Sequence, residues 1–335
     1  MKLTPTSIAK YEIYDVLYND MNQIVIIATF TKDSIPFTIK LNDELFKRQI
    51  CGKKHGCVFT LFQSEYKETI NLTIEDIVYE NIKVNRYPIF ENKLIMSAMV
   101  YNEDNYIVQW IEYYLLLGIS HFVIYDNALS IEKTSYKSIE ITSDLPTLLD
   151  KYIKNNIVTL IEWPYKKRLC HNADATGQIA QQNHSIYTFR TSKYIGLFDI
   201  DEYVNIPSEM NIDLYIDKMI QQKKINIDRY SAINIRCKLF YNPDRLPTDG
   251  YKFLKIYNCD KVTTFGREKS FVIPKNDITY CIHTVTSGKP IYVADNNLYF
   301  NHYYYLNKEN RGIVNTDLSD NSIHRIIQIL LNIVK

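Results

Sequence analysis

The first part of the chain, up to about residue 90, alternates short apolar runs with turn residues. β-Branched or aromatic residues gather in four runs, and no window before Pro88 shows the 3.6-residue period of an amphipathic helix. The four runs are Val25–Phe30, Pro36–Leu41, Gly56–Phe62 and Glu68–Thr73. This pattern predicts a small β-rich domain over residues 1–90, in the form of an antiparallel sheet or sandwich.

The pattern changes at about residue 91, where near-continuous apolar runs begin to alternate with helical periodicity. Such runs are typical of strands buried on both faces, and the strands predicted are Lys93–Tyr101, His121–Tyr125, Ile157–Glu162 and Tyr194–Phe198. The helices predicted are Asp104–Leu117, Leu145–Asn155, Ala173–Arg190, Ile212–Lys223 and a last one near Asn321–Val334. Gly118 stands where a helix-ending glycine belongs. The alternation predicts an α/β domain with a doubly wound, mostly parallel sheet.

The composition is that of a globular chain long enough for two domains. Its 335 residues carry a net charge of +1, and we divide them into a first domain, 1–90, and a second, 91–335. Near-neutral charge argues against a nucleic-acid partner, because phosphate contacts need an excess of basic residues. The longest uncharged apolar stretch near the N-terminus, Met21–Thr31, is far shorter than the roughly 18–20 residues that span a bilayer. We therefore expect no transmembrane segment and a cytoplasmic protein, in which the six cysteines are reduced.

Glycine is scarce in this chain. It has 9 glycines, whereas the usual frequency of about 7% would give roughly 23 in this length. Neither G-x-G-x-x-G nor G-x-x-x-x-G-K-[ST] occurs, so the two common glycine-rich phosphate loops are absent from the sequence. If the chain binds a nucleotide, another group must neutralise the phosphates.

Polar and acidic residues follow three of the predicted strands at their carboxyl ends. Asn102 and Glu103 follow the first strand, Asp126 follows the second, and residues 199–202, of sequence DIDE, follow the last. Ligands of open parallel sheets bind outside the carboxyl ends of the strands. The sequence therefore predicts that these side chains converge on one crevice.

Asp199 and Asp201 stand two residues apart, so in extended backbone both carboxylates point the same way and can share a cation. Oxygen ligands suit Mg²⁺ or Mn²⁺, and such an ion would hold a diphosphate without a glycine loop. The alternative is a strand end whose acids only cap a following helix. His283 or His302 could be a third ligand, or a hydrogen-bonded structural histidine. Asp126 could accept hydrogen bonds from a ribose or base, or be an ordinary turn residue.

Ordered elements of the second part resemble glycosyltransferase family 92, which has the GT-A fold. The opening of the family is similar to residues 99–103 (MVYNE), 110–113 (WIEY) and 121–127 (HFVIYDN). Its F-x-D-x-D-E-F, K-S-I-x-x-P…H and late H-Y…E elements are similar to residues 196–203 (GLFDIDEY), 269–274 (KSFVIP) with His283, and His302-Tyr303 with Glu309. Gln178 falls where the family often has glutamine. The resemblance spans about residues 94–310.

By this resemblance the protein would transfer a hexose, galactose or a related sugar, from a UDP-sugar to a glycan or glycoconjugate acceptor, with inversion. Asp199 and Asp201 would hold Mn²⁺ or Mg²⁺, with His283 or His302 completing the shell. The residues at the nucleotide-sugar would be Asn102, Glu103, Asp126, Gln178, Asp199 and Lys269. A carboxylate base would deprotonate the acceptor hydroxyl, and the candidates are Glu202, Glu268, Asp244 and Asp249.

One position departs from the family pattern, since Tyr114 stands where its members usually have histidine. Two other classes of protein also stay open. A sugar nucleotidyltransferase would use the same sheet and acids, but it usually has a glycine- and Arg/Lys-rich loop where this chain has Asn102 and Glu103. A catalytically inactive carbohydrate-binding protein is the second alternative, although the presence of Asp199, Asp201 and His283 argues against it.

Overall fold

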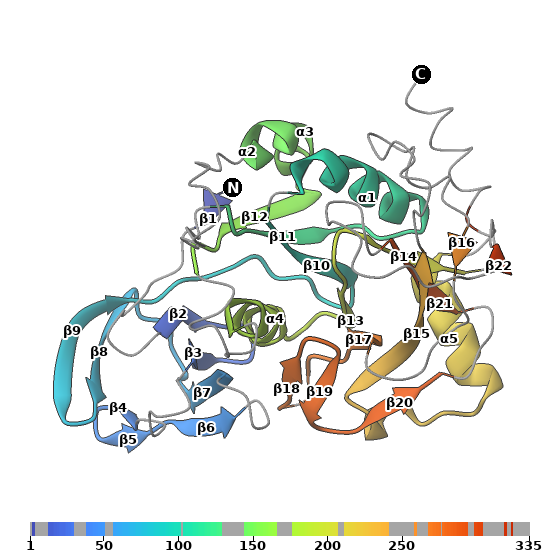
Figure 1. Ribbon diagram of the computed structural model, residues 1–335. Helices are drawn as coiled ribbons and strands as arrows, with labels where there is room; N and C mark the ends of the chain where they lie inside the picture. The colour runs from blue at the N-terminus through green and yellow to red at the C-terminus, as the bar shows by residue number, and fades with distance from the viewer. Residues whose placement is uncertain are drawn as a thin grey trace.

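The computed structural model shows a mixed α/β protein with a large curled sheet and a β-rich N-terminal region (Figure 1). It describes residues 2–3, 13–29, 38–50, 56–101, 103–128, 144–165, 176–206, 211–240, 258–259, 267–275, 277–293, 298–303, 318–319 and 323. The helix predicted near Asn321–Val334 lies outside the described residues, as do Asn102, Asp244 and Asp249. Within the described chain, no helix is long and apolar enough to cross a membrane.

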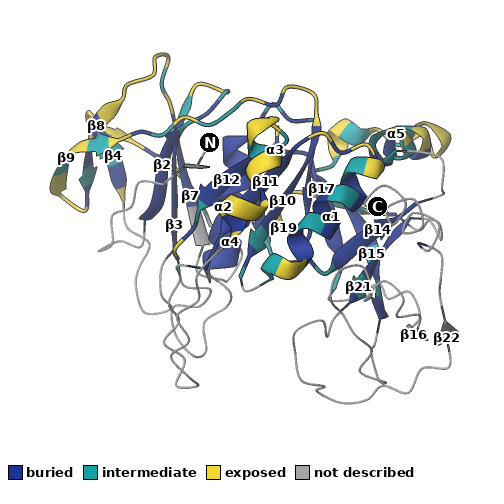
Figure 2. Cartoon of the chain, turned by 90° about the horizontal axis from the view of Figure 1, so that it is seen from above, coloured by how far each residue is buried: buried dark blue, intermediate teal, exposed yellow. Residues whose placement is uncertain are grey.

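The N-terminal region consists of two four-stranded antiparallel sheets, which confirms the predicted β-sandwich. One sheet has the order β2 (Ile13–Tyr18), β3 (Gln23–Thr29), β7 (Gly56–Phe62), β6 (Lys47–Ile50). The other has the order β5 (Glu44–Leu45), β4 (Ile39–Leu41), β8 (Thr69–Ile74), β9 (Ile77–Lys83). Alternate apolar residues of the two sheets, such as Ile26, Phe59 and Leu72, form one buried core between them. Figure 2 shows the outer strand β9 as largely exposed.

The large sheet is mixed, and the predicted parallel sheet makes up one side of it. Neighbouring strands are parallel in the order β1 (Lys2–Leu3), β12 (Val158–Glu162), β11 (Phe122–Asp126), β10 (Leu94–Val100), β13 (Tyr194–Leu197). The sheet continues with antiparallel neighbours in the order β17 (Lys269–Val272), β15 (Ala232–Phe240), β16 (Asn258–Cys259), β22 (Leu318–Ser319). The strand β1 therefore joins the sheet of the second predicted domain, although it stands at the start of the first.

Five more of the described strands lie beside this path, three of them in the large sheet and two in a separate hairpin. They are β14 (Glu202–Asn205), β20 (Pro290–Tyr292), β21 (Tyr299–Tyr303) and the hairpin β18 (Thr279–Cys281) with β19 (Thr284–Ser287). The strand β21 pairs antiparallel with β14 and parallel with β15, and so connects β14 to the large sheet. This connection places residues from three distant parts of the sequence side by side.

Helices cover both faces of the large sheet, as a doubly wound arrangement requires. They are α1 (Asp104–Leu116), α2 (Leu145–Leu148), α3 (Asp150–Lys154), α4 (Thr176–Thr188), α5 (Ile212–Gln222) and the 3₁₀ turn Ile227–Arg229. On β10, Met96 and Ala98 belong to the apolar core that includes α1, whereas Ile95 belongs to the core that includes α4. The single helix predicted over 145–155 is two short helices, separated at the buried Leu149. Gly118 ends α1 with a φ of +84°, as predicted.

Helix α4 lies between the large sheet and the N-terminal sandwich (Figure 1). One apolar core continues from the sheet through this helix to Tyr14, Leu17 and Val25 of the sandwich. The order of the parallel strands also reverses beside α4, because the chain runs from β10 outward to β12 and returns on the other side of β10 as β13. Such a reversal is where open α/β sheets bind their ligands.

Candidate active site

The candidate active site lies at this reversal, beyond the carboxyl ends of β10 and β13. The chain leaves β10 toward Glu103 and leaves β13 toward residues 199–202. A short turn follows β13, in which the Glu202 N–H donates to the Asp199 carbonyl at 3.1 Å. The Asp199 N–H in turn donates to Oε2 of Glu202 at 2.9 Å. These two hydrogen bonds turn the chain back into β14 and fix the three acids relative to one another.

The carboxylate of Asp199 has a hydrogen-bond partner on each oxygen. Lys269 Nζ donates to Oδ2 at 2.7 Å, and Gln178 Nε2 donates to Oδ1 at 3.1 Å. Lys269 reaches this position because β17 pairs antiparallel with β13 and begins beside the end of that strand. Gln178 comes from the first turn of α4. The structure thus brings together three of the residues predicted for the nucleotide-sugar.

Glu202 and His302 stand opposite each other across the antiparallel pair of β14 and β21. His302 Nε2 lies 3.4 Å from Oδ2 of Asp201, and His302 Nδ1 lies 3.7 Å from Oε1 of Glu202. The Tyr303 N–H donates to the Asp201 carbonyl at 2.9 Å, and this hydrogen bond connects the turn to β21. Cys237 of β15 also lies near this ring, with Sγ 4.0 Å from Nδ1.

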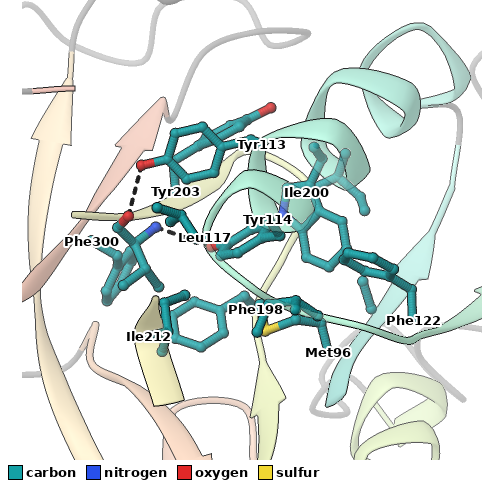
Figure 3. Packing of buried hydrophobic residues seen from close by; sticks show 14 of the residues in the cluster. Met96, Tyr113, Tyr114, Leu117, Phe122, Phe198, Ile200, Tyr203, Ile212 and Phe300 are labelled. Atoms are coloured by element: carbon teal, nitrogen blue, oxygen red, sulfur yellow. Dashed lines mark hydrogen bonds between the residues drawn. The ribbon is translucent and has the colours of Figure 1, made fainter. Parts of the chain in front are cut away.

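Helix α1 holds the free edge of β14 with three aromatic side chains, two of which, Tyr113 and Tyr114, are labelled in Figure 3. The Trp110 indole and the Tyr114 hydroxyl donate to the Glu202 carbonyl at 3.2 and 3.0 Å. The Tyr114 hydroxyl also accepts from the Val204 N–H at 3.0 Å, and the Tyr113 hydroxyl donates to the Val204 carbonyl at 2.7 Å. Because buried backbone groups need partners, these side chains take the place of a further strand.

Charge is concentrated in this site and much of it is buried. The side chains of Lys269 and Glu202 are each 1% exposed, and Lys269 Nζ lies 3.2 Å from Oε2 of Glu202. Burial raises the pKa of Glu202 to about 7, although the Lys269 charge opposes the shift. Burial lowers the pKa of His302, but the Asp201 carboxylate outweighs it and the pKa rises well above the ordinary value. The imidazole is therefore protonated at neutral pH when only these side chains surround it.

The side chains of Asp201, Glu202 and His302 could hold a metal ion. Their ligand atoms all lie within 4.8 Å of one another. Two carboxylates and one imidazole suit Mn²⁺, which accepts oxygen ligands and takes imidazole more readily than Mg²⁺ does. Asp199, the other acid predicted as a ligand, is not in this group and is held by Lys269 and Gln178.

His283, the other candidate third ligand, also stands outside this group. It lies in the turn between β18 and β19, and its Nδ1 is 3.3 Å from the carbonyl of Glu268. Burial, reinforced by the nearby Lys269 charge, lowers the pKa of His283 to about 4. His283 is therefore neutral at pH 7 and lies on the Lys269 side of the site.

The other described candidates lie around this centre. Asp126 ends β11, and its Oδ1 accepts the Ala128 N–H at 3.1 Å, which is the turn role that the sequence left open. Glu103 is the N-cap residue of α1 and its side chain makes no capping hydrogen bond. Glu268 is buried directly before β17.

Sequence reasoning missed the side chains of α1 that hold β14, namely Trp110, Tyr113 and Tyr114. They contact residues about ninety positions further along the chain. The one available signal was Tyr114, which departs from the histidine of the resembled pattern.

Two comparisons with known proteins match this chain, and the family match covers the part of it that carries the candidate site. The model of the family described as Glycosyltransferase family 92 matches residues 95–328. A protein of Ricinus communis named as a glycosyltransferase family 92 protein is 25% identical over 224 residues. That alignment covers 64% of this chain and 35% of the Ricinus protein, so the chain spans about a third of the length of this relative. All of the site residues described above lie within the matched range.

Proposed function

The chain belongs to glycosyltransferase family 92, since the family model matches more than half of it, and from this membership we propose that it is a hexosyltransferase. In this proposal it transfers galactose or a related hexose from a UDP-sugar to a glycan or glycoconjugate acceptor, with inversion and with Mn²⁺ or Mg²⁺ as cofactor. The observation that supports it best is the group of Asp201, Glu202 and His302 beside Asp199, at the point where strand order reverses.

In the proposal Asp201, Glu202 and His302 hold the ion, which when bound neutralises charge on the leaving diphosphate. Asp199 and Lys269 form a rigid pair next to it, since their ion pair is 2.7 Å long and Lys269 is buried. A charged group held in place before the donor binds needs little rearrangement when the donor arrives. Asp126 and Glu103 face the same edge of the sheet and belong to the nucleotide side of the proposed site.

The acceptor hydroxyl would lose its proton to a carboxylate while its oxygen attacks the anomeric carbon and the bond to the diphosphate breaks. Glu202 is poorly placed for this role, because its Oε2 accepts from the Asp199 N–H and faces Lys269 at 3.2 Å. We assign it to metal binding instead. Among the described candidates this leaves Glu268 as the proposed base, together with Asp244 and Asp249 outside the described residues.

The sugar nucleotidyltransferase and the inactive carbohydrate-binding protein are the alternatives to this proposal. Family membership favours transfer of a sugar over synthesis of a nucleotide-sugar. The charged cluster favours catalysis over simple carbohydrate binding, because a buried glutamate beside a buried lysine costs free energy and is typical of functional sites.

The test is release of UDP, GDP or CMP from a panel of nucleotide-sugars by the purified full chain with Mn²⁺. We expect UDP release from a UDP-hexose, and we expect EDTA and the Asp201→Ala substitution each to reduce it to background. Asp213→Ala is the matched control, since Asp213 pairs with Lys193 away from the site and its loss should leave the rate unchanged. No release from any donor, or release that EDTA does not affect, would contradict the proposal.

A further inference from the structure

Helix α4 is buried on every side, although most of its side chains are polar. Every residue from Gly177 to Thr188 is buried. Its buried polar residues are Gln178, Gln181, Gln182, Asn183, His184, Ser185 and Thr188. Buried polar groups cost free energy unless each finds a partner, so a helix of this kind is held by specific hydrogen bonds rather than by an apolar stripe. The partners come from two directions.

On one side α4 holds the candidate active site. Gln178 donates to Asp199 at 3.1 Å. Asn183 pairs with both backbone groups of Tyr280, accepting its N–H and donating to its carbonyl at 2.9 Å each, and Gln182 accepts the Ile282 N–H at 2.9 Å. These last contacts fix the hairpin of β18 and β19, whose turn carries His283.

On the other side α4 is anchored to the N-terminal sandwich. His184 Nε2 lies 2.9 Å from Oδ2 of Asp15, which is in β2, and both side chains are 0% exposed. The same Oδ2 accepts the Tyr87 hydroxyl at 2.6 Å, while Oδ1 accepts the Asn85 amide at 2.8 Å and the Val16 N–H at 2.9 Å. A carboxylate that accepts four hydrogen bonds uses all its lone pairs.

The direction of these hydrogen bonds is fixed by their partners. Since the Asp15 carboxylate only accepts, His184 Nε2 must carry a proton. Because the Tyr125 hydroxyl accepts from Ser185, it donates in turn to Nδ1 of His184, 2.7 Å away. The Ser185 hydroxyl donates to Tyr125 at 3.0 Å, so Ser185, Tyr125, His184 and Asp15 form one ordered series of donors that ends in the carboxylate. Series of this kind favour one arrangement of the elements that they join.

We propose that the N-terminal sandwich supports the transferase site through α4, with Asp15 and His184 as positioning residues for donor binding. The pair sets the position of α4, and α4 in turn sets Gln178 against Asp199 and the hairpin of His283 beside them. This inference rests on the proposed function for the identity of the donor. The proposal also implies that the sandwich is not a separable module. Separable domains meet through smaller and more polar interfaces than the continuous apolar core found here.

The test compares two substitutions in the full chain that both remove a contact between the sandwich and the rest. Asp15→Asn keeps the size and shape of the buried side chain. It replaces one carboxylate oxygen with an NH₂ group, which cannot accept a hydrogen bond from the donors that surround Asp15. Lys47→Ala removes the ion pair of Lys47 with Asp277, which is 2.8 Å long and lies at the exposed rim. The probe is UDP in the presence of Mn²⁺, titrated by calorimetry at a temperature where both variants are folded.

We expect Asp15→Asn to weaken UDP binding by about fivefold or more, while Lys47→Ala stays within about twofold of the unsubstituted chain. Hydrogen exchange should rise in residues 176–188 and 279–287 of Asp15→Asn only. If Asp15→Asn does not fold, Tyr87→Phe replaces it, because it removes a single donor to the same carboxylate. Unchanged UDP affinity in the folded variant would overturn the proposal.

Failure of the proposed function gives a different result. If the unsubstituted chain binds neither Mn²⁺ nor UDP, the donor assignment is wrong and the exchange experiment alone decides the inference. Faster exchange in residues 279–287, which Asp15 does not contact directly, would then support coupling through α4. Exchange that changes only around Asp15 would overturn it.

Discussion

The hydroxyl of Tyr114 donates to the carbonyl of Glu202 at 3.0 Å, across 88 residues of sequence. The same hydroxyl accepts the Val204 N–H at 3.0 Å, so one phenol satisfies both a carbonyl and an amide on the free edge of β14. This strand begins at Glu202 and follows Asp201, two of the three proposed metal ligands. Tyr114 therefore couples helix α1 directly to the geometry of the candidate metal site.

We expect Tyr114→Phe to lower the free energy of unfolding by about 1–3 kcal/mol, because a buried N–H loses its partner. The carbonyl of Glu202 keeps its hydrogen bond from Trp110, which limits the loss. Urea denaturation followed by circular dichroism measures the change. Affinity for Mn²⁺ should fall in the same variant, because the turn that carries Asp201 is less firmly held.

Tyr113→Phe is the matched control for this substitution. Tyr113 is equally buried and lies next to Tyr114, but its hydroxyl makes one hydrogen bond, to the Val204 carbonyl at 2.7 Å. The cost should be smaller, about 1 kcal/mol, and Mn²⁺ affinity should change less. Equal losses of Mn²⁺ affinity in the two variants would contradict a particular role for Tyr114.

Lys269 provides a test of the buried charge in the site. Lys269→Met leaves the buried carboxylate of Glu202 without the ammonium group 3.2 Å away, and removal of one member of a buried ion pair costs about 3–5 kcal/mol. Lys193→Met is the control, because Lys193 also pairs with two carboxylates, those of Asp213 and Asp217, at a much more exposed position. Its loss should cost no more than about 1 kcal/mol. Chemical denaturation that gave equal costs would show that Lys269 is not a buried structural cation.

The sequence predicts where the candidate site lies because the signal for it is local. Each acidic segment directly follows an apolar run. A buried strand seldom ends in acidic residues such as Asp199 unless they have a partner to bind. Parallel strands place their carboxyl ends together, so the convergence followed from the strand assignment alone. The same reasoning predicted the alternation of strands and helices and the end of α1 at Gly118.

The partners within the site could not be predicted in the same way. Glu202 meets His302 only because β14 pairs with β21, and that register depends on chain geometry over about a hundred residues. The sequence offers His283 and His302 equally as the third metal ligand. Only the pairing of β14 with β21 brings His302, and not His283, beside Glu202. Helix α4 gave a weak signal for a related reason, since its polar residues are satisfied by partners from distant segments rather than by solvent.

The buried His121 predicts an acid-dependent loss of stability. Burial lowers its pKa to about 4, and its ring nitrogens lie 3.0 Å from the Asn156 carbonyl and 2.9 Å from the Thr159 hydroxyl. The unfolded chain takes up the proton near its ordinary pKa, whereas the folded chain resists it. The stabilisation is therefore complete above about pH 6.5 and is lost as pH falls toward 4.

For this one group the loss between pH 7.5 and pH 5 should be about 2 kcal/mol of unfolding free energy. Urea denaturation at the two pH values measures it, and His121→Asn should show a correspondingly smaller difference. Other groups titrate in both proteins. The difference between the two proteins in how the free energy of unfolding changes with pH therefore isolates His121. An equal change in the free energy of unfolding in both proteins would mean that His121 is protonated without cost in the folded protein.

Gly196 tests how tightly the sheet is packed directly before the site. A Cβ atom at this position in β13 would lie 2.4 Å from Sδ of Met96 and 3.1 Å from Cε1 of Phe271, on the two neighbouring strands. Gly196→Ala should therefore cost about 1–3 kcal/mol through overpacking. In the Met96→Ala background the same substitution should cost less, because the closest atom is gone, and a double-mutant cycle measures the coupling. Since the turn that carries Asp201 directly follows β13, the strained single variant should also bind Mn²⁺ more weakly, and the double variant should regain part of that affinity. Additive effects on stability would mean that the strand shifts to accept the methyl group, in which case the contact with Met96 does not fix the position of β13.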